Sequence, residues 1–179
     1  MGSQLALTRL DRQNGEISHF SLTSTFKKQP GPQHIVGIHR DGQNDLWVAM
    51  RDGLYRLDEN SGQSQKFEAS VGGETPPIFT DMAVDDSGGL WFVTHNKLLH
   101  FDIQAEQYVS EHITFDISPD QIDDQVIMVD RQGTIWLGLG RGRLLKIDPQ
   151  SGQQVEFRHQ PDISTSLGRG QINAISEDL

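Results

Sequence analysis

The sequence has no cysteine, few aromatic residues, no long apolar run and no excess of basic residues. The absence of cysteine excludes a disulfide scaffold. No segment approaches the roughly 18 to 20 apolar residues of a membrane-spanning helix, and no signal-peptide core follows Met1. The 15 Lys and Arg are outnumbered by 25 Asp and Glu, which gives a formal charge of −10. We therefore expect neither a nucleic-acid surface, which needs clustered basic side chains, nor membrane contact by this segment.

What the chain does contain is an internal repeat. Its three tryptophans stand in related segments, at Trp47, Trp91 and Trp136, with spacings of 44 and 45 residues. A hydrophobic residue followed directly by an aspartate comes ten or eleven positions after each tryptophan. A further copy of this pair, Leu10-Asp11, stands near the N-terminus. Another aspartate precedes each tryptophan by six positions. These aspartates are Asp41, Asp85 and Asp130, and Asp178 matches them at the C-terminus.

Each repeat contains four short apolar runs separated by Gly, Asn and Asp, and none has the length of an amphipathic helix. Runs of about five residues with β-branched and aromatic side chains favour strands. Four strands recurring every 44 to 47 residues are typical of an all-β fold built of β-propeller blades. We predict three complete blades and complementary parts of a fourth. The expected boundaries are a part-blade at 1–20, blades at 34–68, 78–111 and 124–158, and the first strand of a next blade at 171–179.

The best copy of the repeat, Ile38 through Asp58, resembles the two-component regulator propeller family, with Asp41, Leu46, Trp47, Gly53, Leu54, Arg56 and Asp58 in the family's positions. The segment 161–167, with its Ser-Leu ending, is similar to the family's inter-blade connection. The copy around Trp91 departs from this pattern and is reminiscent of streptogramin-lyase-type propellers. Members of the family usually carry the propeller as the extracytoplasmic input of a sensor. The resemblance therefore implies a periplasmic or extracytoplasmic sensory region whose output domain lies outside this chain.

The phasing of the repeat predicts that both ends of the chain fall inside a blade. This phasing leaves three alternatives open: a segment of a longer propeller, a dimer whose chains exchange strands into one eight-bladed ring, and a small closed four-bladed ring. An unclosed propeller exposes edge strands, which readily pair with another chain. We therefore expect self-association through edge strands.

Residues that recur in every blade are more simply explained as scaffold than as a site. We assign Trp47, Trp91, Trp136, Asp41, Asp85 and Asp130 to the scaffold, because an aspartate at a turn binds its own backbone. Function is expected where the repeats differ. The candidate ligand-binding residues are Arg141 and Arg143 in a glycine-rich segment and His39 and Arg40 beside Ile38. Four acidic residues on a connector are a weak candidate metal site without the order of a calcium loop, namely Asp116, Asp120, Asp123 and Asp124.

No arrangement of residues in the sequence points to catalysis. The seven histidines lack metal-ligand spacing, and no nucleophile elbow is present. We therefore predict a non-catalytic module without a cofactor that recognises a small molecule, a glycan or a protein. The alternatives are a propeller-scaffold enzyme such as a streptogramin-lyase-like lyase and a purely structural assembly module.

Overall fold

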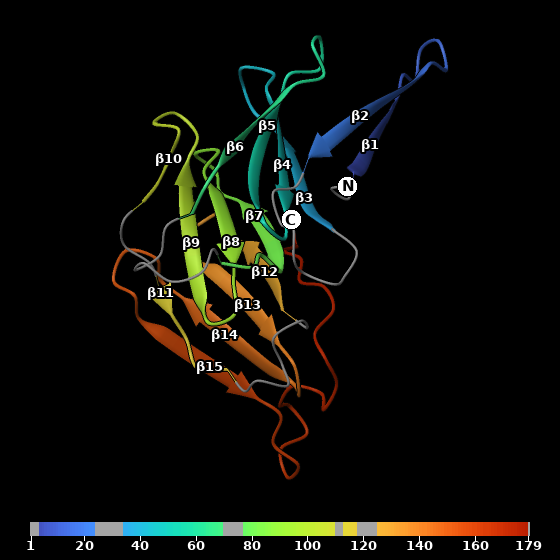
Figure 1. Ribbon diagram of the computed structural model, residues 1–179. Helices are drawn as coiled ribbons and strands as arrows, with labels where there is room; N and C mark the ends of the chain where they lie inside the picture. The colour runs from blue at the N-terminus through green and yellow to red at the C-terminus, as the bar shows by residue number, and fades with distance from the viewer. Residues whose placement is uncertain (1–3, 24–33, 70–76, 110–112, 118–124, 179) are drawn as a thin grey trace. The chain divides into compact units, whose positions relative to one another are not determined.

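The computed structural model describes residues 4–23, 34–69, 77–109, 113–117 and 125–178, and all structural statements below concern these residues. The chain divides into two compact units, residues 1–76 and 77–179, and each is described by itself. The regular structure consists of β-strands in four antiparallel sheets (Figure 1). No helix with the length and hydropathy needed to span a membrane occurs in this part of the chain.

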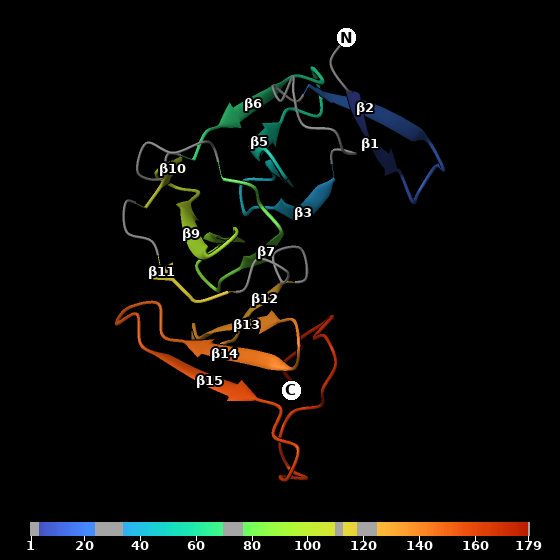
Figure 2. The same ribbon diagram turned by 60° about the horizontal axis from the view of Figure 1, so that its bottom comes forward.

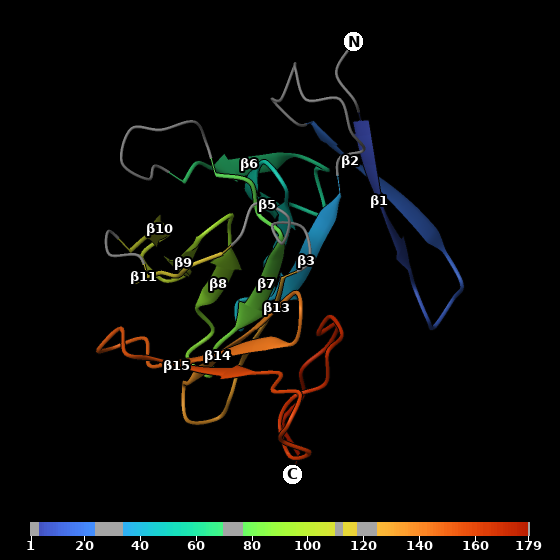
Figure 3. The same ribbon diagram turned by 90° about the horizontal axis from the view of Figure 1, so that it is seen from below.

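The first unit contains a two-stranded and a four-stranded sheet. A long hairpin joins β1 (Gln4–Leu10) to β2 (Ile17–Thr23) in continuous register (Figure 3). The second sheet is a meander in which each strand pairs with the next. Its strands are β3 (Ile35–Arg40), β4 (Leu46–Met50), β5 (Gly53–Leu57) and β6 (Ser64–Phe67).

The second unit contains two further meanders. The strands of the first are β7 (Asp81–Val84), β8 (Leu90–Val93), β9 (Lys97–Asp102), β10 (Gln107–Tyr108) and β11 (Ile113–Thr114), of which β10 and β11 both pair with β9. Those of the second are β12 (Val126–Val129), β13 (Ile135–Leu139), β14 (Arg143–Ile147) and β15 (Gln154–Arg158), which lie side by side in that order (Figure 2).

We call the face that carries the tryptophan in the three larger sheets the front face, and the opposite face the back face. In the β1–β2 sheet the front face carries Leu7, Arg9 and Phe20, at positions that correspond to Leu54, Arg56 and Phe67. Successive side chains along a strand point to opposite faces. A strand with apolar residues at consecutive positions therefore contributes to a core on both faces.

Both units bury a front face against a back face. In the first unit Phe20 and Leu22 on the front of β1–β2 cluster with Val48, Met50 and Leu57 on the back of β3–β6. In the second unit the front of β7–β11 packs on the back of β12–β15. Its members include Ala83, Val93, Leu98, Ile127, Ile135, Leu137, Leu145 and Ile147. Polar contacts support this packing, since Asp81 Oδ2 accepts the Ile127 amide at 2.9 Å and Thr80 donates to Gln125 Oε1 at 2.7 Å.

The four sheets agree with the predicted strands but differ from the predicted boundaries at three places. The first hairpin runs to Thr23, three residues past the expected part-blade. The outer strand of the middle blade is split, so that β11 extends this sheet to Thr114, into a segment expected to be a connector. Residues 171–178 form no strand, although their sequence matches that of β3. A strand needs a hydrogen-bonded partner, and no described strand pairs with this segment.

Candidate functional site

An aspartate holds the tryptophan in each of the three complete sheets. Asp41 Oδ2 accepts the Trp47 indole N–H at 2.8 Å, and the distances are 3.0 Å in the Asp85–Trp91 pair and 2.8 Å in the Asp130–Trp136 pair. The other carboxylate oxygen accepts backbone amides two and four residues further along the turn. Burial opposes ionisation, but these hydrogen bonds outweigh it and lower the pKa of each aspartate. This geometry supports the scaffold interpretation of the repeated residues.

A Lys or Arg side chain covers an aromatic ring on the front of three of the four sheets. The guanidinium of Arg56 lies 5.6 Å from the Trp47 ring centre, and the ammonium of Lys146 lies 5.5 Å from that of Trp136. In β1–β2 the corresponding residue is Arg9, 5.9 Å from the Phe20 ring. Such cation–π contacts join the third strand of a sheet to its neighbours.

The middle sheet replaces this cation with a histidine. The His100 ring stacks on Trp91, with ring centres 4.4 Å apart and an angle of 21° between the planes. His100 Nε2 lies 3.2 Å from Asp85 Oδ2, an electrostatic contact whose geometry is not that of a hydrogen bond. The ring fits because residue 89 is glycine, where a Cβ atom would lie 2.3 Å from His100 Nε2.

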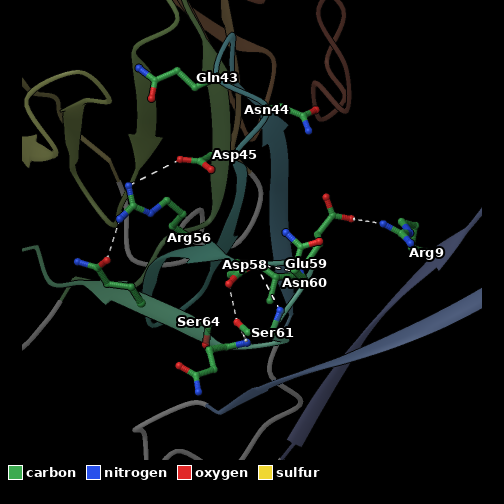
Figure 4. Close-up of a pocket in the computed structure, with 13 residues that line it drawn as sticks. Arg9, Gln43, Asn44, Asp45, Arg56, Asp58, Glu59, Asn60, Ser61 and Ser64 are labelled. Atoms are coloured by element: carbon green, nitrogen blue, oxygen red, sulfur yellow. Dashed lines mark hydrogen bonds and ion pairs between the residues drawn. The ribbon is translucent and has the colours of Figure 1, made fainter.

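A polar pocket of about 590 Å³ lies in the first unit, at the end of the β3–β6 sheet where two turns meet (Figure 4). The turn between β3 and β4 contributes Gln43, Asn44 and Asp45. Residues 58–65 supply a second wall, and Arg9 from β1 borders the pocket. Leu57 is the single apolar residue among the described ones that line it.

Glu59 fixes the position of the arginines at this pocket. Its two carboxylate oxygens accept from Arg9 at 3.0 Å and from Arg40 at 2.5 Å. Arg40 also donates to the Asn44 carbonyl at 2.8 Å, so it joins the two turns. Burial disfavours the charge of Glu59, but the two arginines overcome this effect and lower its pKa. The carboxylate is therefore ionised near neutral pH and ties β1, β3 and the β5–β6 turn together.

The pocket has a nearly balanced charge. Arg9 and Arg56 face the carboxylates of Asp45, Asp58 and Glu59, and Arg40 adds a positive charge behind the wall. Arg56 is held by Gln65 at 2.9 Å and lies 3.7 Å from Asp45. Amide and hydroxyl groups make up most of the remaining surface. This lining suits an uncharged or zwitterionic molecule with several hydrogen-bonding groups better than a strong anion or a cation.

An equivalent cavity of about 720 Å³ occurs in the second unit. It is bordered by the corresponding turns of β12–β15, where Gln132, Thr134 and Gln150 stand at the positions of Gln43, Asp45 and Asn60. Its lining differs because Trp91 and Val155 add apolar surface. The position of the cavity therefore recurs with the repeat, whereas the residues that line it differ from sheet to sheet.

Of the predicted ligand-binding residues, Arg40 lies at the first pocket, although it supports the wall instead of lining it. His39 lies opposite Trp47 in the β3–β4 register and does not line the described pockets. Arg143 is bound to Glu156 at 2.5 Å and to the Asp116 carbonyl at 3.1 Å, an arrangement that crosses from β14 to its neighbours. Arg141 is exposed in the turn before β14. The structure therefore does not bring the four residues together.

The glycines around Arg141 serve close packing. An added Cβ at Gly142 would lie 2.2 Å from the Gly168 carbonyl oxygen, and one at Gly138 would lie 2.7 Å from Ile172. The segment after β15 thus passes directly over β13 and its turn, as the red segment beside that sheet shows (Figure 3). Strand β14 follows these glycines directly.

The acidic cluster cannot be assembled from the described residues. Asp116 is exposed, and Asp120, Asp123 and Asp124 lie outside the described part of the chain. Within that part, no group of three or more His, Asp or Glu side chains is placed to hold a metal ion.

Comparison with solved structures identifies the fold. The chain is similar to the extracellular domain of BT4673 from B. thetaiotaomicron, described as a one-component system in one structure and as a hybrid two-component system in another. The TM-scores are 0.74 and 0.71 at 17% identity, over 99% and 96% of this chain but only 23% and 22% of that one. Virginiamycin B lyase from Staphylococcus aureus is also similar, with a TM-score of 0.62 and 17% identity over 88% of this chain and 50% of the lyase. The chain is built of β-propeller blades.

Sequence comparison adds no family to this fold: no protein-family model matches the chain, and no curated protein does. At 17% identity the structural likeness establishes the propeller architecture alone. The chain spans about a quarter of the BT4673 extracellular domain and half of the lyase.

Most pocket residues were missed by reasoning from the sequence. Gln43, Asn44 and Asn60 are ordinary turn residues, and nothing in their spacing distinguishes them from loop residues elsewhere. A usable signal existed at Glu59. In each repeat one residue directly follows the aspartate at the end of the third strand, and its charge varies between repeats while the aspartate recurs. These residues are Arg12, Glu59, Ile103 and Pro149.

Proposed function

We propose that this chain is a non-catalytic ligand-recognition segment of an extracytoplasmic signalling sensor. The observation that carries the proposal is the charge-balanced pocket between the turns of β3–β6, whose arginines are held in place by Glu59. Fixed polar groups around a cavity of this size select a small polar molecule. The likeness to extracellular domains of signalling proteins supports the sensory setting.

The ligand class follows from the lining. A neutral sugar, a polyol or a zwitterionic amino acid can exchange hydrogen bonds with Gln43, Asn60 and Ser64 without leaving an uncompensated charge. A glycan end or a polar protein loop presents the same groups. Occupation of the pocket would brace Arg9 on β1 against the turns of the next sheet, which gives a route from binding to the packing of blades.

The test is a binding screen with neutral monosaccharides, polyols and zwitterionic amino acids, read by thermal shift and then by calorimetry. At least one of these compounds should stabilise the chain. Gln43→Ala/Asn60→Ala should weaken its binding at least tenfold, while the matched pair in the second cavity, Gln132→Ala/Gln150→Ala, should leave it unchanged. The proposal is wrong if no compound binds or if both pairs of substitutions have the same effect.

A lyase is the second candidate, because the structural likeness extends to virginiamycin B lyase, including a catalytically inactive histidine-to-alanine form solved with quinupristin at a TM-score of 0.65. The described histidines gather around no shared cavity here: His100 is stacked on Trp91, and His159 is bound to the Leu167 carbonyl at 2.7 Å. We expect quinupristin incubated with the chain to keep its chromatographic retention. A time-dependent new product would favour the lyase.

A further inference from the structure

The exposed apolar side chains of this molecule gather on two sheet faces. Of the seven large hydrophobic residues that are exposed in the described part of the chain, four lie in strands of the first sheet or the last one, and a fifth lies beside the last one. Leu10 and Ile17 are 58% and 57% exposed, and they form a cross-strand pair on the back of β1–β2. Val155 and Phe157 are 53% and 42% exposed on the front of β12–β15. Ile163 is the fifth and lies at the rim of that same front face.

The front face of β12–β15 is hollowed as well as apolar. Trp136 and Phe157 stack with their ring centres 6.2 Å apart. With Leu144, Ile163 and Leu167 they line a cavity of about 420 Å³, and polar residues such as Gln160 and Ser166 surround it. An aromatic-lined hollow with a polar rim is the usual form of a protein contact site.

A front face and a back face also pack against each other inside each unit of the molecule. The front of β1–β2 covers the back of β3–β6 in the first unit, and the front of β7–β11 covers the back of β12–β15 in the second. The back of β1–β2 and the front of β12–β15 are the faces of the first and last sheets that take no part in these two clusters. One is a back face and the other is a front face, which is the combination that packs together inside each unit. A single chain therefore carries both halves of one further interface.

We infer that two copies of this chain associate head to tail, with the back of β1–β2 in one copy packed on the front of β12–β15 in the other. Leu10 and Ile17 would fill the hollow beside Trp136 and Phe157, as Ile135 and Leu137 lie against Trp91 and Val93 within the second unit. This contact is heterologous, because each copy contributes a different face. It does not depend on the proposed ligand.

Complementary variants test this inference directly. Phe157→Glu/Val155→Glu removes the front face and Leu10→Glu/Ile17→Glu removes the back face, each at exposed positions. By analytical ultracentrifugation over a wide range of concentration, the unmodified chain should associate and each double variant should be monomeric. An equal mixture of the two variants should form a 1:1 complex, because each still has the face that the other lost. Val109→Glu, at an exposed apolar position on neither face, should associate as the unmodified chain does.

A second measurement uses the absence of cysteine. Ile17→Cys mixed with Phe157→Cys should yield a disulfide-linked heterodimer under mild oxidation, and Val109→Cys should link poorly with either. Head-to-tail pairing is refuted if the unmodified chain stays monomeric, if either double variant associates alone, or if the mixture does not. Equal cross-linking of all cysteine pairs would also refute it.

Discussion

The middle sheet, β7–β11, and its neighbour β12–β15 cover their tryptophans with different residues. Both hold a tryptophan by an aspartate, yet β12–β15 has Thr134 and Lys146 where the middle sheet has Gly89 and His100. The compact imidazole stacks on the indole and approaches the aspartate, which the missing side chain at residue 89 permits. Lys146 instead extends over Trp136 toward the second cavity. The residue that covers the tryptophan, His100 or Lys146, thus differs between the two sheets together with the residue at position 89 or 134.

The largest effect is expected when this coupling is broken at Gly89. In Gly89→Ala the new Cβ would lie 2.3 Å from His100 Nε2 and 2.8 Å from Asp85 Oδ2, which displaces the ring or the carboxylate. We expect a loss of about 1–3 kcal/mol in the free energy of unfolding, measured by urea denaturation. Asp45→Ala, at the corresponding half-buried position of β3–β6, should cost less than about 0.5 kcal/mol.

His100→Ala in the Gly89→Ala background tests the cause. Removal of the ring relieves the overlap, so the double variant should be more stable than the sum of the single losses predicts. Strictly additive losses would contradict the coupling between residues 89 and 100.

An intermediate effect is expected from the aspartate that both sheets share. In Asp130→Asn one carboxylate oxygen becomes an NH2 group, so either the Trp136 indole N–H or the turn amides lose their acceptor. We expect a loss of about 1–2 kcal/mol in the free energy of unfolding near neutral pH, smaller than the loss in Gly89→Ala. The pKa of Asp130 is lowered in the folded state, so its stabilisation is present above the ordinary aspartate pKa and is lost as the pH falls below about 4. Urea denaturation as a function of pH should show a shallower acid limb for the variant.

Asp178→Asn is the matched control for this substitution. Asp178 occupies the same position of the repeat but is exposed and has no tryptophan after it in the sequence. Its substitution should leave the free energy of unfolding at neutral pH unchanged. If Asp178→Asn and Asp130→Asn behave alike, the indole hydrogen bond is not the source of the stabilisation.

The smallest effect concerns the turn that closes each outer hairpin. Glu106 has a φ of 52°, where Gly15, Gly62 and Gly152 have 77°, 70° and 69°. A side chain disfavours this left-handed conformation, so Glu106→Gly should stabilise the chain by up to about 1 kcal/mol in thermal unfolding. Gly152→Ala in the neighbouring sheet should have the opposite sign. A destabilised Glu106→Gly variant would show that the side chain contributes more than its strained backbone costs.

The sequence was sufficient for the strands but not for the pocket. The tryptophan strands, the aspartates and the glycine turns are encoded by residues close together in the chain, so their pattern alone predicts β4, β8, β13 and the hairpins that follow. Glu59 meets Arg9 fifty residues away, and spacing alone could not reveal this contact. For the same reason the sequence suggested Arg143 as a ligand-binding residue, whereas the fold pairs it with Glu156 on the next strand.

The sequence by itself therefore determined the repeat, its all-β character and the chemistry of its turns, because a strand and its tight turn depend on local alternation and on backbone preferences. Only the tertiary structure decided which turns enclose a cavity, that His100 needs Gly89, and that residues 171–178 lie beside Gly138 without a strand partner. It also decided that the first sheet exposes apolar residues on its back face and the last sheet on its front face. Each of these depends on which sheet meets which face, and that is set by packing between residues far apart in the chain.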